Sequence, residues 1–212
     1  MRANEIASGT IEDMSNHVKK QIWLLRHAQT EWSENGRHTG SRSDIPLTAE
    51  GEANARLMEP VVSKHPFELV LTSPLQRARR TAELAGVLDQ ATEDANLLEW
   101  DYGDYEGITT AEIRRTVPDW TVWTRPCPGG ETGEDVAARA RHVIDRAMSV
   151  EGDVALFSHG HYLRVLAATW LELSAHHGAD FTLGTGTICI LGFEHEYRTI
   201  LRWNERVGGS EP

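Results

Sequence analysis

A cation and an imidazole stand together at the end of an apolar stretch: Arg26 and His27 follow directly on the run 21–25, Gln-Ile-Trp-Leu-Leu. The run predicts a short buried strand, and the polar residues 28–31 predict the loop that leaves it. Open α/β sheets bind ligands just beyond the carboxyl ends of their strands. An arginine fork suits phosphate or carboxylate, and a neutral imidazole can attack phosphorus. The alternative is that Arg26 forms a surface ion pair beside a structural histidine, and evidence from other parts of the sequence is needed to distinguish the two interpretations.

A second histidine, His159, occupies the matching position late in the chain. It follows the apolar run 153–157, which predicts another strand, as His27 follows the first. The carboxyl ends of parallel strands meet at one edge of a sheet, so we expect the two imidazoles to lie close together there. One imidazole could then attack phosphorus while the other donates to a phosphoryl oxygen.

A metal site is the competing interpretation of this region. His159 and His161 have the alternate spacing of some metal sites, and His176 and His177 lie nearby in the sequence. A metal hydrolase would normally add a carboxylate ligand in register, and the sequence offers no such cluster. We therefore expect no metal ion and no cofactor.

Two further side chains could complete a site for phosphoryl transfer. Arg77 lies one turn into a helix predicted to begin at residue 73, so its side chain and the helix N-terminus could point at the same anion. Glu99 could protonate a leaving oxygen and then act as a base toward water. A solvated basic face is the alternative for Arg77, since Arg79 and Arg80 follow, and an ordinary loop carboxylate is the alternative for Glu99.

Four segments in a fixed order resemble the histidine phosphatase superfamily, the phosphoglycerate-mutase-like group. They are Arg26-His27 followed by Thr30-Glu31-Trp32, the run 73–82 (SPLQRARRTA), the run 98–107 (LEWDYGDYEG) and the run 158–161 (SHGH). Four motifs in the family order are far more specific than any one of them, and the resemblance covers about residues 21 to 203. It implies a phosphoglycerate-mutase-like fold.

The resemblance also implies a role for each chemical residue. His27 would be the nucleophile that forms a phosphohistidine. Arg26, Arg77 and His159 would bind phosphate, and Glu99 would donate the proton to the leaving oxygen. Every one of these residue types stands at its family position in this sequence.

Other positions depart from the family pattern or lie on the substrate side of it. Ala28 stands where the family usually has glycine, and Ser33 where it often has asparagine. Thr39-Gly40 occupies a family turn that touches the substrate, and His161 the place of a substrate-side asparagine. We therefore expect substrate contacts at Ser33, Thr39, Gly40 and His161. These combinations look closest to the sedoheptulose bisphosphatase and acid-phosphatase branch, which suggests a sugar phosphate.

Composition limits the class of protein and its partners. The chain has 212 residues, enough for one α/β domain with a substantial core. A formal net charge of −11 repels nucleic acid and anionic membranes, so we expect neither as a partner. Two distant cysteines, Cys127 and Cys189, favour a reducing compartment, although one disulfide stays open. No apolar run approaches the ~20 residues of a membrane span, so a cytoplasmic protein is predicted. A homodimer stays open.

The order of the expected elements indicates a single α/β domain of three layers, with a mostly parallel sheet flanked by helices. Residues 1–20 are predicted to be a flexible leader, 21–205 the domain and 206–212 a tail. Strands are expected at 21–25, 68–72, near 95–97, 153–157, and as a hairpin at 187–193 and 197–203. Helices are expected at 48–64 with Thr48 as N-cap, from Ser73-Pro74 onward, and at 110–116, 132–150 and 161–173.

The predicted function is metal-independent hydrolysis of a phosphomonoester on a small phosphorylated metabolite. The segment 120–130 carries Trp120, Trp123 and a non-helical Pro/Gly stretch, and it could close over the site and set specificity. Core packing explains both tryptophans equally well. Two rivals stay open. One is a mutase of the same family, although the chain lacks the longer insertion that we associate with mutases; the other is a non-catalytic protein that binds sugar phosphates.

Overall fold

A six-stranded sheet in the order β3-β2-β4-β1-β5-β6 organises the computed structural model, which describes residues 20–208. Its strands are β1 (Ile22–Arg26), β2 (Leu69–Thr72), β3 (Ala91–Glu93), β4 (Val154–Ser158), β5 (Ile188–Glu194) and β6 (Tyr197–Glu205). The first four strands pair in parallel, whereas β5 runs antiparallel to β1 and forms a hairpin with β6. The predicted mostly parallel sheet and C-terminal hairpin are confirmed. The predicted leader, apart from Lys20, lies outside the described residues, as do residues 209–212 of the predicted tail.

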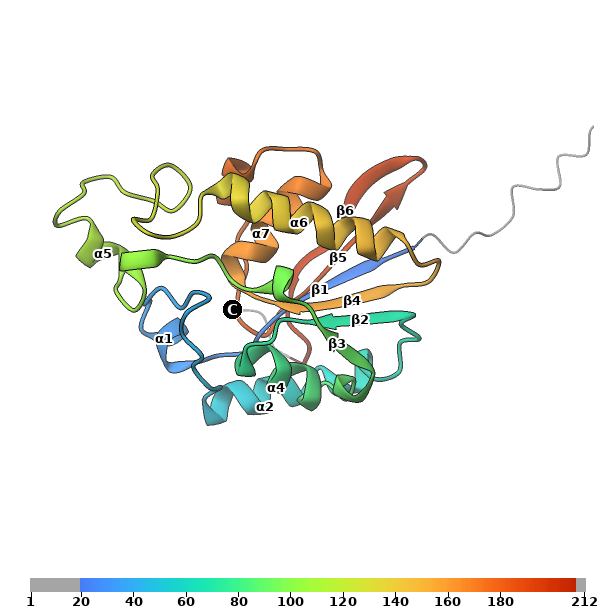
Figure 1. The fold of residues 1–212 in the computed structure, drawn as a ribbon. Helices are drawn as coiled ribbons and strands as arrows, with labels where there is room; N and C mark the ends of the chain where they lie inside the picture. Colours follow the sequence, from blue (N-terminus) through green and yellow to red (C-terminus); the bar gives the residue numbers. More distant parts are fainter. Residues whose placement is uncertain (1–19, 209–212) are drawn as a thin grey trace, which may run out of the picture.

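Helices cover both faces of the sheet, which gives the three predicted layers (Figure 1). On one face lie α6 (Gly133–Met148) and α7 (Gly160–Trp170), and on the other α2 (Ala49–Arg56), α3 (Glu59–Val62) and α4 (Gln76–Leu84). Short helical pieces complete the chain: α1 (Glu31–Glu34), η1 (Leu88–Gln90), η2 (Ala95–Leu97), η3 (Gly103–Tyr105), α5 (Thr110–Ile113) and η4 (Ala175–Asp180). Each face of the sheet buries its own apolar cluster. None of the helices within residues 20–208 is long and apolar enough to cross a membrane.

Local sequence explains where the long helices begin. The Thr132 side chain accepts from the Asp135 N–H at 3.2 Å, and the Asp135 carboxylate accepts from the Thr132 N–H at 2.9 Å, a capping box that starts α6. Val136, Ala140 and Val143 then recur at helical spacing and are buried. The predicted N-cap of α2, Thr48, is also confirmed, since its side chain accepts from the Gly51 N–H at 3.0 Å.

Three predicted elements are wrong in detail. The helix expected over 48–64 is broken after Arg56 and resumes as α3, because Pro60 has no N–H to donate and cannot lie in a helix interior. The strand expected near 95–97 is the 3₁₀ helix η2, where the Asp94 carboxylate accepts from the Asn96 N–H at 2.9 Å; β3 precedes it. The helix expected from Ser73 begins only at Gln76, because the Ser73 hydroxyl bonds a histidine instead of capping the helix.

The parallel register brings three strand ends to one edge of the sheet. Arg26 of β1 pairs with Ser158 of β4, and Thr72 of β2 pairs with Phe157 of β4. The residues that follow these strands therefore emerge side by side at the carboxyl edge, which is the edge where open α/β sheets bind ligands.

Candidate active site

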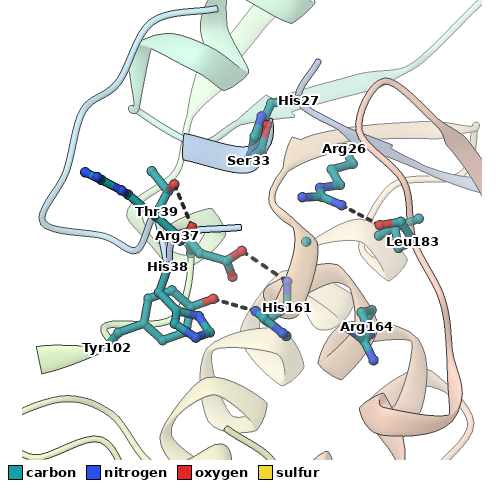
Figure 2. Close-up of a pocket in the computed structure, with 12 residues that line it drawn as sticks. Arg26, His27, Ser33, Arg37, His38, Thr39, Tyr102, His161, Arg164 and Leu183 are labelled. Carbon is teal, nitrogen blue, oxygen red and sulfur yellow. Dashed lines mark hydrogen bonds between the residues drawn. The ribbon is translucent and has the colours of Figure 1, made fainter. Parts of the chain in front are cut away.

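A pocket of about 480 Å³, counted out to its open mouth, lies at this edge of the sheet. Figure 2 shows Arg26 and Arg164 along one side, His27 and Ser33 at the top, and His38 and Tyr102 along the opposite side. Its walls come from the end of β1, the loop after α1, the segment before η3 and the first turns of α7. The lining residues are Arg26, His27, Ser33, Arg37, His38, Thr39, Glu99, Tyr102, Gly160, His161, Arg164 and Leu183.

His27 is held as a neutral imidazole. Its Nδ1 lies 2.8 Å from the Ala28 carbonyl oxygen, which can only accept, so Nδ1 carries the proton. Burial, with the charges of Arg77 and Arg26, lowers the pKa of His27 well below its ordinary value. His27 is 4 % exposed as a residue and lines the pocket. The unprotonated Nε2 is thus left with a lone pair on the atom that a nucleophile needs.

Arg26 stands beside His27 without a carboxylate partner among the described residues. Its Nη1 donates to the Leu183 carbonyl, while its Nε is buried and has no hydrogen-bond acceptor within residues 20–208. Burial lowers the pKa of Arg26. A Cβ added at Gly160 would lie 3.0 Å from the guanidinium carbon, so glycine allows the close approach. A buried guanidinium with spare N–H groups at a pocket wall is suited to an oxyanion.

Arg77 is fully buried and lies behind the pocket wall. Its Nη1 donates to the Ser43 carbonyl at 2.7 Å and its Nη2 to the Gly40 carbonyl at 3.0 Å. Its Nε donates to Nδ1 of His159 at 3.1 Å. All of these acceptors are neutral, so the charge of Arg77 is positioned by the loop after β1 and is not cancelled by it.

His159 brings its ring to 5.2 Å from that of His27, measured between centroids. Burial, with the charges of Arg77 and Arg26, lowers the pKa of His159 well below its ordinary value. Because Nδ1 accepts from Arg77, the neutral ring carries its proton on Nε2, which donates to the Ser73 hydroxyl at 2.7 Å. Both ring nitrogens therefore have protein partners, and a direct bond to phosphate needs Nε2 to leave Ser73.

Glu99 lies at the N-terminus of α7 and lines the pocket. Its Oε1 accepts from the backbone N–H of Tyr162 at 2.8 Å and of Trp100 at 2.9 Å, and its Oε2 accepts from the His161 N–H at 3.0 Å. The helix end holds this carboxyl group in one place. The neighbouring Glu106 instead braces the loop behind Arg77, since its Oε1 accepts from the Gly40 N–H at 2.9 Å.

The four residues predicted to contact substrate fall into two groups. Ser33, Thr39 and His161 line the pocket, although the Ser33 hydroxyl is engaged at the start of α1, where it accepts from the Thr30 N–H at 2.9 Å in the capping box and donates to the Thr30 carbonyl at 2.8 Å. Gly40 lies behind the wall, where its carbonyl accepts from Arg77. Gly40 thus reaches the site only through that arginine.

The opposite wall contains residues that the sequence analysis did not single out. Burial lowers the pKa of His38 to about 4 and raises the pKa of Tyr102 well above its ordinary value, so both stay neutral. The Tyr102 hydroxyl lies 2.5 Å from Nδ1 of His161, whose pKa burial also lowers. On the other side of the pocket, Arg164 lines the wall next to Arg26, at the first turns of α7. A sequence signal existed for each of these two residues. His38 is adjacent to the predicted turn at Thr39, and Arg164 lies about one helical turn after His161, on the same face of the helix.

The two tryptophans of the segment 120–130 pack behind residues that line the pocket, and no residue of this segment lines it. Trp120 is 1 % exposed and packs edge-on against His38, with ring centroids 5.3 Å apart. Trp123 is partly exposed and packs against His161 at 5.1 Å. Trp120 therefore supports the pocket from the core, while Trp123 packs behind the lining residue His161. Among residues 20–208, no group of three or more histidines, cysteines and carboxylates is arranged to hold a metal ion.

Comparison with known proteins supplies the family. The model described as "Histidine phosphatase superfamily (branch 1)" matches residues 22–206. An acid phosphatase of Mycobacterium tuberculosis is 40 % identical over 185 residues, which cover 85 % of this chain and 90 % of that protein. Sedoheptulose 1,7-bisphosphatase of Saccharomyces cerevisiae is 35 % identical over 184 residues, covering 71 % and 67 %. The solved structure of a Mycobacterium tuberculosis open reading frame superposes with a TM-score of 0.83 at 38 % identity, covering 88 % of this chain and 98 % of that one.

Proposed function

The chain belongs to branch 1 of the histidine phosphatase superfamily and is a phosphoric monoester hydrolase of that family, and from that premise we propose that it removes phosphate from a small sugar phosphate through a phosphohistidine at His27. The observation that carries the proposal is a neutral imidazole with a free Nε2 between two buried arginines that lack carboxylate partners among the described residues.

The arginines account for phosphate binding. In phosphoryl transfer, the protein mainly has to position the reacting groups and place positive charge against the negatively charged equatorial oxygens of the transferring group. Arg26 has an unused buried N–H beside the nucleophile, and Nη1 of Arg77 has a second N–H beyond the one that the Ser43 carbonyl accepts. In the proposal, His159 exchanges the Ser73 hydroxyl for a phosphoryl oxygen and becomes the third donor.

His27 and Glu99 divide the two chemical steps. Nε2 of His27 attacks phosphorus and forms a P–N bond as the P–O bond to the sugar breaks. Glu99 in its protonated form gives its proton to the departing oxygen. The resulting carboxylate then takes a proton from the water that attacks the phosphohistidine, which releases phosphate and restores both groups.

The relatives support the substrate class. The curated relatives act on phosphate esters, and one of them is named for a sugar bisphosphate. The wall opposite the arginines offers hydrogen-bonding groups that burial keeps uncharged, namely His38, Tyr102 and His161. Neutral polar side chains of this kind suit the hydroxyl groups of a substrate better than they suit a cationic or extended apolar group of a substrate.

Phosphate release from three- to seven-carbon sugar phosphates, with a chelator present, tests the proposal. We expect hydrolysis of at least one of them in the wild-type protein and none above background in His27→Ala. Isomer interconversion of phosphoglycerate without net phosphate release would identify a mutase instead. Tight binding of sugar phosphates without phosphate release anywhere between about pH 5 and 8 would identify a binding protein.

A further inference from the structure

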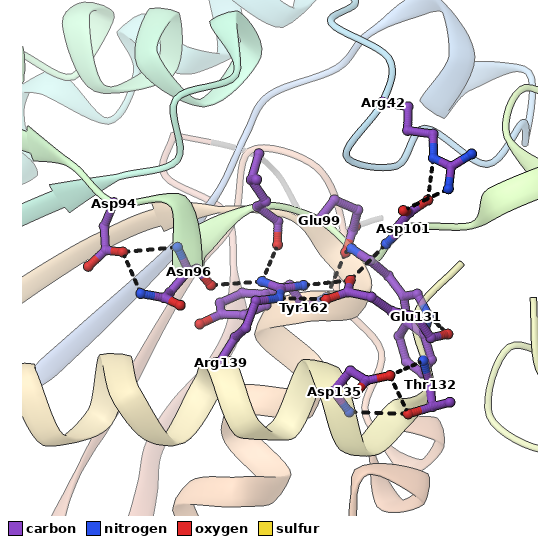
Figure 3. Close-up of polar contacts among 12 residues, drawn as sticks. Arg42, Asp94, Asn96, Glu99, Asp101, Glu131, Thr132, Asp135, Arg139 and Tyr162 are labelled. Carbon is purple, nitrogen blue, oxygen red and sulfur yellow. Dashed lines mark hydrogen bonds and ion pairs between the residues drawn. The ribbon is translucent and has the colours of Figure 1, made fainter. Parts of the chain in front are cut away.

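Arg139 of α6 forms a two-pronged ion pair with Glu131 and reaches the chain just before Glu99 (Figure 3). Nε and Nη2 of Arg139 donate to the two carboxylate oxygens of Glu131 at 2.8 and 2.9 Å. Its Nη1 donates to the carbonyls of Asn96 and Leu98 at 2.8 and 3.0 Å. The guanidinium group therefore joins α6 to the segment that carries Glu99.

Glu131 bonds to the chain on the other side of Glu99. Its Oε2 accepts from the Asp101 N–H at 2.9 Å, and its own N–H donates to the Asp101 carbonyl at 2.9 Å. Its carbonyl accepts from Nε1 of Trp100 at 2.9 Å. Gly130 allows this close approach, since a Cβ there would lie 2.2 Å from the Asp101 carbonyl oxygen. The Arg139/Glu131 pair thus holds the backbone before and after Glu99.

The carboxyl group of Glu99 is held from α7, and the same pair reaches that helix as well. The oxygens of Glu99 accept from the N–H groups of Trp100, His161 and Tyr162. The Tyr162 ring packs against Arg139, whose guanidinium carbon lies 5.0 Å from the ring centre, within cation–π range. Arg139 therefore contacts both the segment that carries Glu99 and a residue whose N–H binds its carboxyl group.

The pair has no direct access to a substrate. Neither side chain is among those that line the pocket, and the two side chains are 19 % and 22 % exposed. Arg146, two turns further along α6, provides a comparison on the same helix face: it donates from one nitrogen to Asp94 at 2.7 Å, and its side chain is 41 % exposed. A partly buried fork fixes its partners more closely than an exposed contact from one nitrogen.

We propose that Arg139 and Glu131 are positioning residues for phosphomonoester hydrolysis, which hold Glu99 where its proton can reach the departing oxygen. The inference rests on the proposed function, which makes Glu99 the proton donor. A general acid must lie within hydrogen-bond reach of the atom that it protonates, and a misplacement of about 1 Å can cost about 100-fold in rate. Loss of the pair should therefore matter most for a leaving group that needs the proton.

Two esters of similar shape test this positioning role. Phenyl phosphate releases a basic oxygen that needs a proton, whereas the p-nitrophenyl oxygen departs without one. Arg139→Met removes the fork and keeps most of the stem. We expect it to slow single-turnover phosphoenzyme formation about 10- to 100-fold with phenyl phosphate and about twofold or less with p-nitrophenyl phosphate. Arg139→Lys keeps the charge beside Glu131 without the fork and should lie between.

A merely structural role predicts a different pattern. Loss of folded protein would slow both esters equally, so equal slowing, or no slowing, in Arg139→Met would overturn the positioning role. Arg146→Met removes the neighbouring arginine and should leave both rates at the wild-type value; a loss as selective as that of Arg139→Met would also overturn it. If Arg139→Met does not fold, Glu131→Gln supplies the same comparison of esters with the same two outcomes.

A double variant separates this inference from the proposed function. A residue that acts only through Glu99 should cost nothing further once the proton donor is gone, so Glu99→Gln/Arg139→Met should react with phenyl phosphate as slowly as Glu99→Gln alone. A further tenfold loss would overturn the positioning role. If Glu99→Gln is selective for phenyl phosphate and Arg139→Met is not, only this inference fails. If Glu99→Gln slows both esters equally, the proton donor of the proposed function fails, and the positioning role fails with it.

Discussion

Imidazole groups lie at both ends of the central sheet, partly buried at the amino end and buried at the carboxyl end, and their surroundings carry opposite charge. At the amino end, His65 donates to the Asp153 carboxylate at 2.7 Å and packs against Trp23 and Phe67, with both ring centroids 4.5 Å away. At the carboxyl end, His27 and His159 face Arg26 and Arg77. One histidine is matched by a negative charge, and the other two are surrounded by positive charge.

This difference distinguishes a histidine that stabilises the fold from histidines that are placed to bind and react with an anion. A histidine with a carboxylate partner and aromatic neighbours has its hydrogen-bonding and packing needs met within the protein. Histidines beside arginines that lack a carboxylate partner raise the free energy of the folded chain, and the binding of an anion offsets this cost. The carboxyl end is thus suited to phosphate, and changes at the two ends should have different consequences.

The largest effect is expected from His27→Ala at the carboxyl end. Removing the nucleophile should lower kcat by about 10⁴-fold or more, comparable to the loss of a nucleophile in other covalent enzymes. Steady-state phosphate release measures kcat, and thermal unfolding provides the control, because the substitution should leave the protein folded and no less stable. Retention of more than a hundredth of the activity would remove His27 from the mechanism.

Glu99→Gln tests whether Glu99 donates a proton during catalysis or only holds the first turn of α7 in place. The loss of the proton donor should slow single-turnover transfer from a sugar phosphate about 10²- to 10⁴-fold. Transfer from p-nitrophenyl phosphate should slow much less, because that leaving group departs without a proton. A rapid-quench measurement of phosphoenzyme formation compares the two. Equal slowing with both substrates would mean that Glu99 serves only to hold the first turn of α7.

His38 makes the carboxyl end sensitive to acid. Its pKa is about 4 in the folded protein against 6.5 ordinarily, so the unfolded chain takes up a proton there that the folded protein does not. The free energy of unfolding should therefore fall as the pH drops from about 6.5 to 4. His38→Gln should remove about 3 kcal/mol of that fall. Urea unfolding at pH 7 and pH 4 measures it, and an unchanged pH dependence in the variant would contradict the account.

His65→Ala is the matched substitution at the amino end, with the smallest expected effect. Losing the bond to Asp153 and the aromatic packing should lower the free energy of unfolding by about 1–3 kcal/mol. The kcat should stay at the wild-type value, since His65 lies at the far end of the sheet. Chemical denaturation and steady-state kinetics on one preparation compare the two. A tenfold fall in kcat without loss of stability would contradict the assignment of a purely structural role to the amino end of the sheet.

The sequence sufficed to predict the carboxyl edge, because strand ends follow from local patterns. Apolar runs before His27 and His159 marked β1 and β4, and the parallel pairing of these strands brings the two rings to 5.2 Å. Arg77 was also placed at the correct end of the sheet, although α4 begins later than predicted. The helix break before α3 was missed despite Pro60, since the apolar pattern continues across it.

The rest of the pocket lining could not be predicted, because it depends on contacts between distant loops. His38 becomes a neutral lining residue only when Trp120 and Tyr102 pack against it, with ring centroids 5.3 and 4.8 Å away. Arg164 looks like an ordinary helix arginine until Gly178 and Trp123 enclose it. The bonding of His159 to Ser73 was equally hidden, since a serine before proline predicts a helix cap more strongly than a partner for a histidine.

The most direct test of the account is the identity of the phosphorylated residue during turnover. Wild-type protein mixed with a hydrolysed sugar phosphate and quenched within one turnover should carry a phosphate that is labile in acid, stable in base, and mapped by mass spectrometry to His27. A phosphate on any other residue, or turnover that leaves no phosphate on the protein at any quench time while His27→Ala stays active, would contradict the central claim.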